Sequence, residues 1–215
     1  MRITPIIFSM LISLAAFAQG SSRFQEEVLS IKKKYDTLLD SSKETIVFTG
    51  SSSIRTWSDL HELFPDYQIV NSGFGGSQAI DLLFYMNELI LQYNPKKVFI
   101  YEGDNDINDH KKPKEIISVT KEIIAKIKNT HPGTGIVIIS AKPSLARWHL
   151  KGKYKKLNRR FKKMCNNGQD LDYVNIWDIM LDGRKLRKDI FIEDGLHMNS
   201  KGYDLWYEVI SNYIQ

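Results

Sequence analysis

The stretch TIVFTGSSSIRTW, residues 45–57, is the best single guide to how this chain folds. An apolar run rich in β-branched residues ends at Gly50, and three serines follow it directly. Short apolar runs of this composition are typical of strands that are buried on both faces. The three hydroxyls form either an ordinary polar turn or a strand end that presents a nucleophile. The partners that decide between these two interpretations must come from the rest of the sequence.

The remaining chain alternates between apolar strands and amphipathic helices. Strands are predicted at residues 44–49, 67–71, 97–101, 135–140 and 171–176. Helices are predicted at residues 24–38, 80–91, 113–131, 151–163 and 200–214. This alternation predicts an α/β fold, a three-layer α/β/α sandwich around a parallel sheet of about five strands. Ligands bind such sheets outside the carboxyl ends of the strands, so the segments after each strand are the ones to search.

The first twenty residues, MRITPIIFSMLISLAAFAQG, have the pattern of a secretory signal peptide. A basic residue precedes an apolar run, and small residues follow it as at a cleavage site. We expect residues 1–18 to be the signal peptide and residues 19–215 to form one domain that is secreted or periplasmic. The alternative is an uncleaved N-terminal anchor, although the apolar run is too short to span a bilayer.

The formal net charge of +5 owes much to the segment KGKYKKLNRRFKK, residues 151–163. Tyr154, Leu157 and Phe161 share one face of this predicted helix, which leaves a cationic face. That face is either simply solvated or contacts an anionic surface such as phospholipid or acidic glycan. No nucleic-acid-binding motif is present, so we expect no nucleic-acid partner. The single cysteine, Cys165, has no neighbouring histidine or cysteine and is predicted to be a passive thiol.

Polar or glycine-rich segments follow the first three predicted strands, and a fourth precedes the last helix. They are residues 50–53, 71–76, 102–106 and 193–197. Acyl transfer needs a serine, a histidine base and a carboxylate that orients the base. Asp194 and His197 are three residues apart, so one tight turn can join the carboxylate to the imidazole. The glycines at 73–76 allow an amide to turn into a cleft, and the Asn105 side chain can donate a hydrogen bond to an oxyanion.

Taken together, these segments resemble the sequence blocks of the SGNH (GDSL) hydrolases, which are esterases and acylhydrolases with a flavodoxin-like α/β/α fold. The family's G-D-S block corresponds to GSS at 50–52, its N-x-x-x-x-G block to residues 71–76, its G-x-N-D block to GDND at 103–106, and its D-x-x-H block to DGLH at 194–197. The resemblance implies that Ser52 is the nucleophile, His197 the base and Asp194 the acid of a triad. It also implies an oxyanion hole made by the amides of Ser52 and Gly76 and the side chain of Asn105.

One residue departs from the family pattern, because Ser51 stands where the family usually has aspartate. That aspartate is not the acid of the family's triad, so we expect the chemistry to survive. The choice of Ser52 over Ser51 and Ser53 therefore rests on alignment with the family. Trp57, which follows the serines, is expected in the core rather than at the substrate.

The resemblance implies a serine esterase that needs no metal or organic cofactor and acts on a small-molecule or glycan ester. With the export signal, it favours a carbohydrate or peptidoglycan O-acetylesterase. The alternative is a lysophospholipase or short-chain lipid acylhydrolase, and the non-enzyme alternative is a glycan-binding module. The substrate-binding residues and the oligomeric state are not indicated by the sequence.

Three other kinds of site fit the sequence less well. The run DNDINDHKKPKE resembles a calcium loop, but Asp109 stands at the position that needs glycine, and we expect Asp106 to organise the Asn105 loop instead. His61, His110, His131 and His149 lack the spacing of zinc ligands. The segment GFGGSQ does not match a nucleotide-binding loop. The segment with Lys142, Pro143, Ser144, Arg147 and Trp148 is either a substrate-contacting loop or a plain connection.

Overall fold

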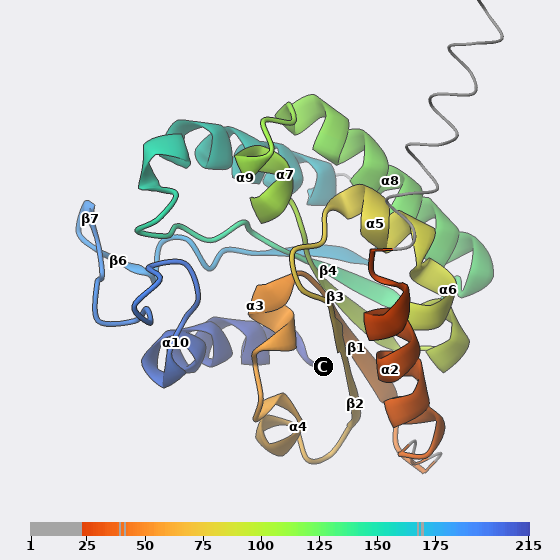
Figure 1. The fold of residues 1–215 in the computed structure, drawn as a ribbon. Coiled ribbons are helices and arrows are strands. Elements are labelled where there is room, and N and C mark those ends of the chain that lie inside the picture. Colours follow the sequence, from red (N-terminus) through yellow and green to blue (C-terminus); the bar gives the residue numbers. More distant parts are fainter. Residues whose placement is uncertain (1–22, 39, 41, 167, 169) are drawn as a thin grey trace, which may run out of the picture.

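A five-stranded parallel sheet forms the centre of the molecule in a computed structural model, which describes residues 23–38, 40, 42–166, 168 and 170–215 (Figure 1). The predicted signal peptide, residues 1–18, lies outside the described residues. The strands are β1 (Thr45–Gly50), β2 (Gln68–Gly73), β3 (Lys97–Tyr101), β4 (Gly135–Ile139) and β5 (Leu171–Val174). Their order is β2-β1-β3-β4-β5, and every neighbouring pair is parallel. The predicted α/β/α architecture is confirmed.

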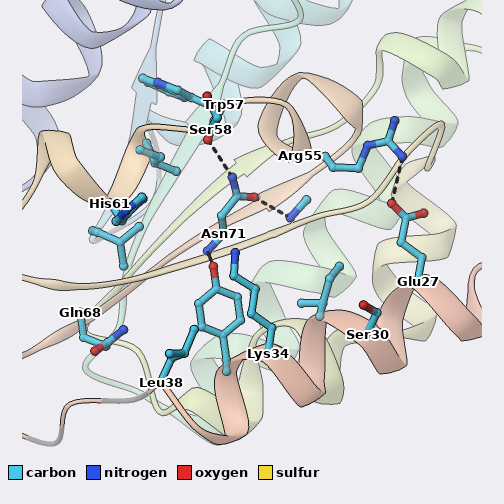
Figure 2. A pocket seen from close by; sticks show the side chains of 15 residues that line it. Glu27, Ser30, Lys34, Leu38, Arg55, Trp57, Ser58, His61, Gln68 and Asn71 are labelled. Atoms are coloured by element: carbon cyan, nitrogen blue, oxygen red, sulfur yellow. Dashed lines mark hydrogen bonds and ion pairs between the residues drawn. The ribbon is translucent and has the colours of Figure 1, made fainter.

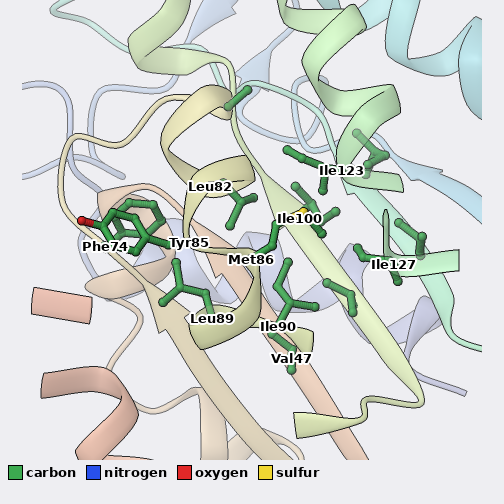
Figure 3. Close-up of a cluster of buried hydrophobic side chains, with 14 of the residues drawn as sticks. Val47, Phe74, Leu82, Tyr85, Met86, Leu89, Ile90, Ile100, Ile123 and Ile127 are labelled. Carbon is green, nitrogen blue, oxygen red and sulfur yellow. The ribbon is translucent and has the colours of Figure 1, made fainter. Parts of the chain in front are cut away.

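Helices cover both faces of the sheet because successive strand residues point to opposite sides. On one face Val47, Val98 and Ile100 pack against α2 (Gln25–Asp36), α5 (Ala79–Phe84), α6 (Met86–Leu89), α8 (Pro113–Thr130) and α9 (Lys151–Cys165), as Figure 3 shows in part. On the other face Phe48 and Phe99 stack with ring centroids 4.4 Å apart. That face is covered by α3 (Ser52–Arg55), α4 (Leu60–Leu63) and α10 (Ser200–Ile210). Trp57 is buried there, as expected.

The prediction of one continuous helix over residues 80–91 is wrong. The segment is divided into α5, α6 and the 3-10 helix η1 (Leu91–Tyr93), with the first break at Tyr85. Leu82, Met86 and Leu89 are buried on both sides of this break and keep a helical spacing. The apolar pattern therefore continues where the backbone does not, and periodicity could not reveal the interruption.

Several short elements are additional to those predicted. They are α3, α4, α7 (Asp104–Asn108), the 3-10 helix η2 (Trp148–Leu150), and a hairpin of β6 (Leu181–Asp182) and β7 (Lys185–Leu186). The helix predicted at residues 200–214 ends in a 3-10 turn, η3 (Ser211–Tyr213). Elements of two to five residues are too short to produce a periodic apolar pattern. Two of them, α3 and α7, carry residues of the candidate site.

Side chains hydrogen-bond to the free edge of β2, as Figure 2 shows. The N–H of Asn71 in edge strand β2 donates to the Tyr35 hydroxyl of α2 at 2.8 Å, and the N–H of Gly73 donates to Asn71 Oδ1 at 3.1 Å. Asn71 Nδ2 in turn donates to the carbonyl of Ile54 at 2.8 Å. These bonds satisfy edge groups that would otherwise invite another strand. They also attach β2 to α3, the helix that begins with Ser52.

Helix α9 has the predicted amphipathic character. Tyr154, Leu157 and Phe161 are buried, whereas its eight basic side chains are exposed and make no ion pair with another described residue. Cys165 at its end is buried, and burial raises the pKa of this thiol to about 12. Such a thiol stays protonated, in agreement with the predicted passive role. Within the described part of the chain, no helix has the length and apolar character needed to cross a membrane.

Candidate active site

The register of the sheet brings the loops after β1, β2 and β3 together. Gly50 of β1 is paired with Gly73 of β2 on one side and with Tyr101 of β3 on the other. The chain leaves β1 toward β2 and later crosses to β3, so this is the point where strand order reverses. Open parallel sheets bind ligands at such a point. The three polar segments predicted from the sequence therefore start side by side.

Ser52 is the first residue of α3, and the backbone before it explains why glycine precedes the serines. Gly50 has φ of 128°, and a Cβ at this position would collide with the carbonyl oxygen of Tyr101. Only glycine fits this conformation at such a close approach. Of the three serines, Ser51 and Ser53 are buried and Ser52 is partly exposed. The strand end thus presents a single hydroxyl.

That hydroxyl lies beside the histidine that was predicted as its partner. Ser52 Oγ is 2.9 Å from His197 Nε2, across 145 residues of sequence. His197 Nδ1 is 2.5 Å from Asp194 Oδ2. The other oxygen, Asp194 Oδ1, accepts the N–H groups of Leu196 at 2.8 Å and His197 at 2.9 Å. The turn therefore fixes the carboxylate, and the carboxylate orients the imidazole toward Ser52.

The carboxylate of Asp194 is held in its ionised form. Partial loss of hydration raises its pKa, but hydrogen bonds from the His197 ring and from the two backbone N–H groups outweigh this and lower the pKa to about 2. An ionised carboxylate accepts the proton on Nδ1 and so leaves Nε2 as the acceptor that faces Ser52. This is the tautomer that can remove the proton of a hydroxyl.

The predicted oxyanion donors Gly76 and Asn105 follow β2 and β3, the strands that flank β1, and Ser52 follows β1. The N–H groups of Ser52 and Gly76 donate no hydrogen bond to another described residue. Asn105 Nδ2 donates one of its two hydrogens to the carbonyl of Ser77 at 2.8 Å, next to Gly76 in sequence. Its second hydrogen has no acceptor among the described residues. These donors are of the kind that a tetrahedral oxyanion requires.

Helix α2 contacts the glycine-rich segment at residues 73–76, which the sequence did not indicate. The N–H of Gly75 donates to Glu27 Oε1 at 3.0 Å, and Arg55 Nη1 lies 3.2 Å from the same oxygen. Figure 2 shows this ion pair at one end of a groove of about 580 Å³, whose lining residues include none of the triad. Glu27 and Gly75 are 48 residues apart, and no local spacing links them. Only the folded chain reveals this contact.

Two buried carboxyl groups, those of Glu102 and Asp106, hydrogen-bond the segment after β3 to the segment after β2. Asp106 Oδ2 accepts the N–H of Ala79 at 3.2 Å, which joins the Asn105 segment to the start of α5. Glu102 Oε1 accepts the Ser77 hydroxyl at 2.7 Å. Burial raises the pKa of Glu102 well above its ordinary value, and the charge of Asp106 raises it further. Asp106 thus organises the Asn105 loop as expected, while the part played by Glu102 was missed.

Other residues that the sequence singled out lie elsewhere or have different roles in the structure. Asp104 to Asn108 form helix α7, and Asp104 pairs with Arg147 at 2.7 Å, so these residues do not form a calcium loop. No group of three or more His, Cys, Asp or Glu side chains in the described ranges could hold a metal ion. His131 Nε2 lies 2.9 Å from the carbonyl of Leu91, well away from the triad in the fold. The segment 142–148 contacts Asp104 and Asn105, so it is more than a plain connection.

Comparison with known proteins identifies the family of this chain. A family model, the GDSL-like Lipase/Acylhydrolase family, matches residues 41–205, and the chain belongs to that family. Members hydrolyse ester bonds, and the resemblance seen in the sequence blocks is confirmed. The match includes every predicted site residue but not helix α2, which carries Glu27. No curated protein matches the chain.

Solved structures share the fold at low sequence identity. A protein from Streptococcus pneumoniae described as a platelet activating factor is 24% identical, with a TM-score of 0.78 and coverage of 96% of this chain and 99% of that chain. A GDSL-like lipase from Bacteroides thetaiotaomicron is 19% identical, with a TM-score of 0.72 and coverage of 90% and 96%. An acetyl-xylooligosaccharide esterase from Geobacillus is 15% identical, with a TM-score of 0.66 and coverage of 79% and 93%.

Proposed function

We propose that the protein is a serine esterase of the SGNH type. Ser52 Oγ attacks the ester carbonyl carbon while His197 Nε2 takes the hydroxyl proton, and the carbonyl oxygen becomes an oxyanion. The Ser52 and Gly76 amides and the Asn105 side chain donate to that oxyanion. His197 then gives its proton to the leaving alcohol, which leaves an acyl group on Ser52. Water, activated by the same histidine, releases the acid and restores the serine.

The observation that carries this proposal is the continuous chain of contacts from Asp194 through His197 to Ser52, with distances of 2.5 Å and 2.9 Å. Hydrolysis of p-nitrophenyl acetate by the purified protein tests it. Ser52→Ala and His197→Ala should each abolish turnover and leave the circular dichroism spectrum unchanged. Full activity in Ser52→Ala together with its loss in Ser53→Ala would move the nucleophile by one residue.

For the substrate, we propose an O-acetyl ester of a carbohydrate or of peptidoglycan outside the cytoplasm. Two points support it, the predicted export of the chain and the esterases among the solved structures with this fold. A signal peptide at residues 1–18, as the sequence predicts, would direct the chain to the envelope or beyond. The solved structures with this fold include the acetyl-xylooligosaccharide esterase and a carbohydrate esterase from Talaromyces cellulolyticus.

A lipid acylhydrolase is the second candidate, and apolar side chains beside the triad favour it. Leu145 is 37% exposed and lies against Gly195 in the turn between Asp194 and His197. Ile192 is 49% exposed, and its N–H donates to the carbonyl of His197 at 3.0 Å. Two exposed aliphatic side chains at this place offer an acyl chain or an apolar alcohol a contact surface.

A substrate panel separates the candidates. Acetylated xylan and O-acetylated peptidoglycan should be deacetylated by the wild type and not by Ser52→Ala. Activity confined to esters of longer acyl chains or to lysophospholipid would favour the lipid enzyme. A protein that hydrolyses none of these esters but binds glycan equally well with and without the Ser52 hydroxyl would be a glycan-binding module.

We also propose that the cationic face of α9 contacts an anionic surface such as phospholipid or acidic glycan. Its exposed basic side chains have no ion-pair partner among the described residues, so their field is not cancelled locally. Cosedimentation with anionic vesicles or acidic polysaccharide at low salt should exceed that with neutral ones. Reversal of Arg159 and Lys163 to glutamate should remove the difference.

A further inference from the structure

We propose that Arg147 is a positioning residue for the oxyanion donor Asn105, and that Asp104 and Lys142 extend this support to the turn that carries His197. The inference rests on the proposed esterase function and adds Arg147 and Lys142, which lie outside the family's four sequence blocks. It arises from a cluster of charges that is almost completely removed from water. Side-chain exposure is 5% for Asp104, 14% for Arg147 and 0% for Lys142.

Arg147 determines which way the Asn105 amide points. Arg147 Nη1 donates to Asn105 Oδ1 at 3.1 Å, and Asn105 Nδ2 donates to the carbonyl of Ser77 at 2.8 Å. A guanidinium is only a donor, and a backbone carbonyl is only an acceptor. If the amide were flipped, its NH₂ would face the guanidinium and its oxygen would face the carbonyl. Both contacts would be repulsive, so the second N–H of Asn105 stays available for the oxyanion.

Arg147 is itself held by a carboxylate with several donors. Asp104 Oδ1 accepts from Arg147 at 2.7 Å and from the Tyr154 hydroxyl at 2.5 Å, and Asp104 Oδ2 accepts from the Tyr101 hydroxyl at 3.1 Å. Burial alone would raise the pKa of Asp104, but the charges of Lys142 and Arg147 outweigh it and lower that pKa. A buried carboxylate bound by this many donors has little freedom, and it restricts Arg147 to one conformation.

The same carboxylate reaches the base through Lys142. Lys142 Nζ lies 3.6 Å from Asp104 Oδ2 and donates to the carbonyl of Leu196 at 2.7 Å. Leu196 lies between Asp194 and His197, and its N–H already donates to Asp194. The N–H of Ala146, also in the segment between β4 and η2, donates to the carbonyl of Gly195 at 3.0 Å. The segment 142–147 therefore supports both the oxyanion donor and the turn with the base.

Steady-state kinetics distinguish a role of Arg147 in positioning Asn105 from a role in supporting the fold. If Arg147 acts through Asn105, its loss should lower kcat and leave KM nearly unchanged, because the oxyanion forms only in the transition state. Its effect should also vanish once Asn105 is gone. If Arg147 only supports the fold, its loss should lower the rate by the same factor whether or not Asn105 is present.

The test is a double-mutant cycle of Arg147→Met and Asn105→Ala with p-nitrophenyl acetate. Arg147→Met should lower kcat by about 10- to 100-fold in the wild type and less than about twofold in the Asn105→Ala background. Arg184→Met, at an exposed arginine between β6 and β7, is the matched control and should change neither constant. Equal factors in the two backgrounds would overturn the proposal. If Arg147→Met does not fold, Arg147→Lys enters the same cycle, because lysine keeps the charge but its nitrogen lies one bond closer to the backbone than Arg147 Nη1, which makes both contacts.

A readout without activity separates this proposal from the esterase function. The Asn105 side-chain amide resonance, assigned by its loss in Asn105→Ala, should be protected from hydrogen exchange in the wild type because Nδ2 is bonded to Ser77. Arg147→Met should reduce this protection by at least about tenfold. Unchanged protection would refute the positioning role even if esterase activity is present. A wild type that shows the protection but hydrolyses no ester would refute the esterase function alone.

Discussion

Asp194→Asn is the substitution that probes the triad most selectively. Asp194 Oδ1 accepts two backbone N–H groups, from Leu196 and His197, so the amide oxygen of asparagine must take that position. The NH₂ group then faces His197 Nδ1 in place of Oδ2, which lies 2.5 Å away in the wild type. Because an NH₂ group donates, Nδ1 must become the acceptor and Nε2 must carry the proton. The ring then points a hydrogen at Ser52 and cannot accept the hydroxyl proton.

The expected loss of kcat in Asp194→Asn follows from the wrong tautomer of His197. In Ser-His-Asp hydrolases this error costs about 10⁴-fold in kcat, which corresponds to roughly 5 kcal/mol of transition-state stabilisation. The Asp194 side chain is 42% exposed, so water can relieve part of the mismatch. We therefore expect a loss of about 10²- to 10⁴-fold. Stability should change by less than about 0.5 kcal/mol, because both backbone contacts to the oxygen are retained.

Steady-state hydrolysis of p-nitrophenyl acetate measures the effect, and urea unfolding checks the stability. Asp189→Asn is the matched control, because Asp189 is an exposed neighbour that pairs with Lys201 at 3.6 Å. It should leave kcat unchanged. An Asp194→Asn protein with kcat within about threefold of the wild type would refute the tautomer argument.

Three further predictions test the surroundings of the site. Burial raises the pKa of Glu102 above its ordinary 4.5, so the folded state keeps a proton that the unfolded chain releases. The free energy of unfolding should therefore fall as pH rises above about 4.5, by up to about 1.4 kcal/mol per pH unit. Glu102→Gln should remove this pH dependence in urea unfolding between about pH 5 and pH 8, and the same slope in both proteins would contradict the account. Glu27→Ala removes the acceptor of the Gly75 N–H and should lower kcat by about tenfold with KM unchanged, whereas Glu26→Ala, the exposed neighbour, should match the wild type. Gly50→Ala should unfold the chain or destabilise it by more than about 4 kcal/mol in thermal melts, because the new Cβ would collide with the carbonyl of Tyr101 and alanine avoids a φ of 128°. A fully stable variant would show that the end of β1 can move to avoid this collision.

The parts of this structure that the sequence predicts are those with strong local signals. The central strands β1, β3 and β4 are short runs of β-branched and aromatic residues buried on both faces, so composition alone marks them. The Asp194–His197 contact spans three residues and needs only one turn. The Ser52–His197 contact spans 145 residues, and the family's block order is what indicated it.

The parts that the sequence did not predict are polar contacts between distant segments. Arg147 reaches Asn105 across 42 residues, and Glu27 reaches Gly75 across 48. The sequence around a single arginine or glutamate does not show whether its side chain will bind a buried partner or remain in solvent. The break at Tyr85 was missed for a related reason, since the apolar side chains keep their helical period across it. Both kinds of feature are set by tertiary packing and appear only when the elements are placed in space.

The central claim is that the Ser52 hydroxyl is the nucleophile, and covalent trapping tests it most directly. A fluorophosphonate should inactivate the enzyme with one equivalent bound, and peptide mass spectrometry should place the phosphonyl group on Ser52. His197→Ala should slow this labelling by at least about a hundredfold, because the base no longer takes the hydroxyl proton. Labelling of Ser51 or Ser53, or equally fast labelling without His197, would contradict the account.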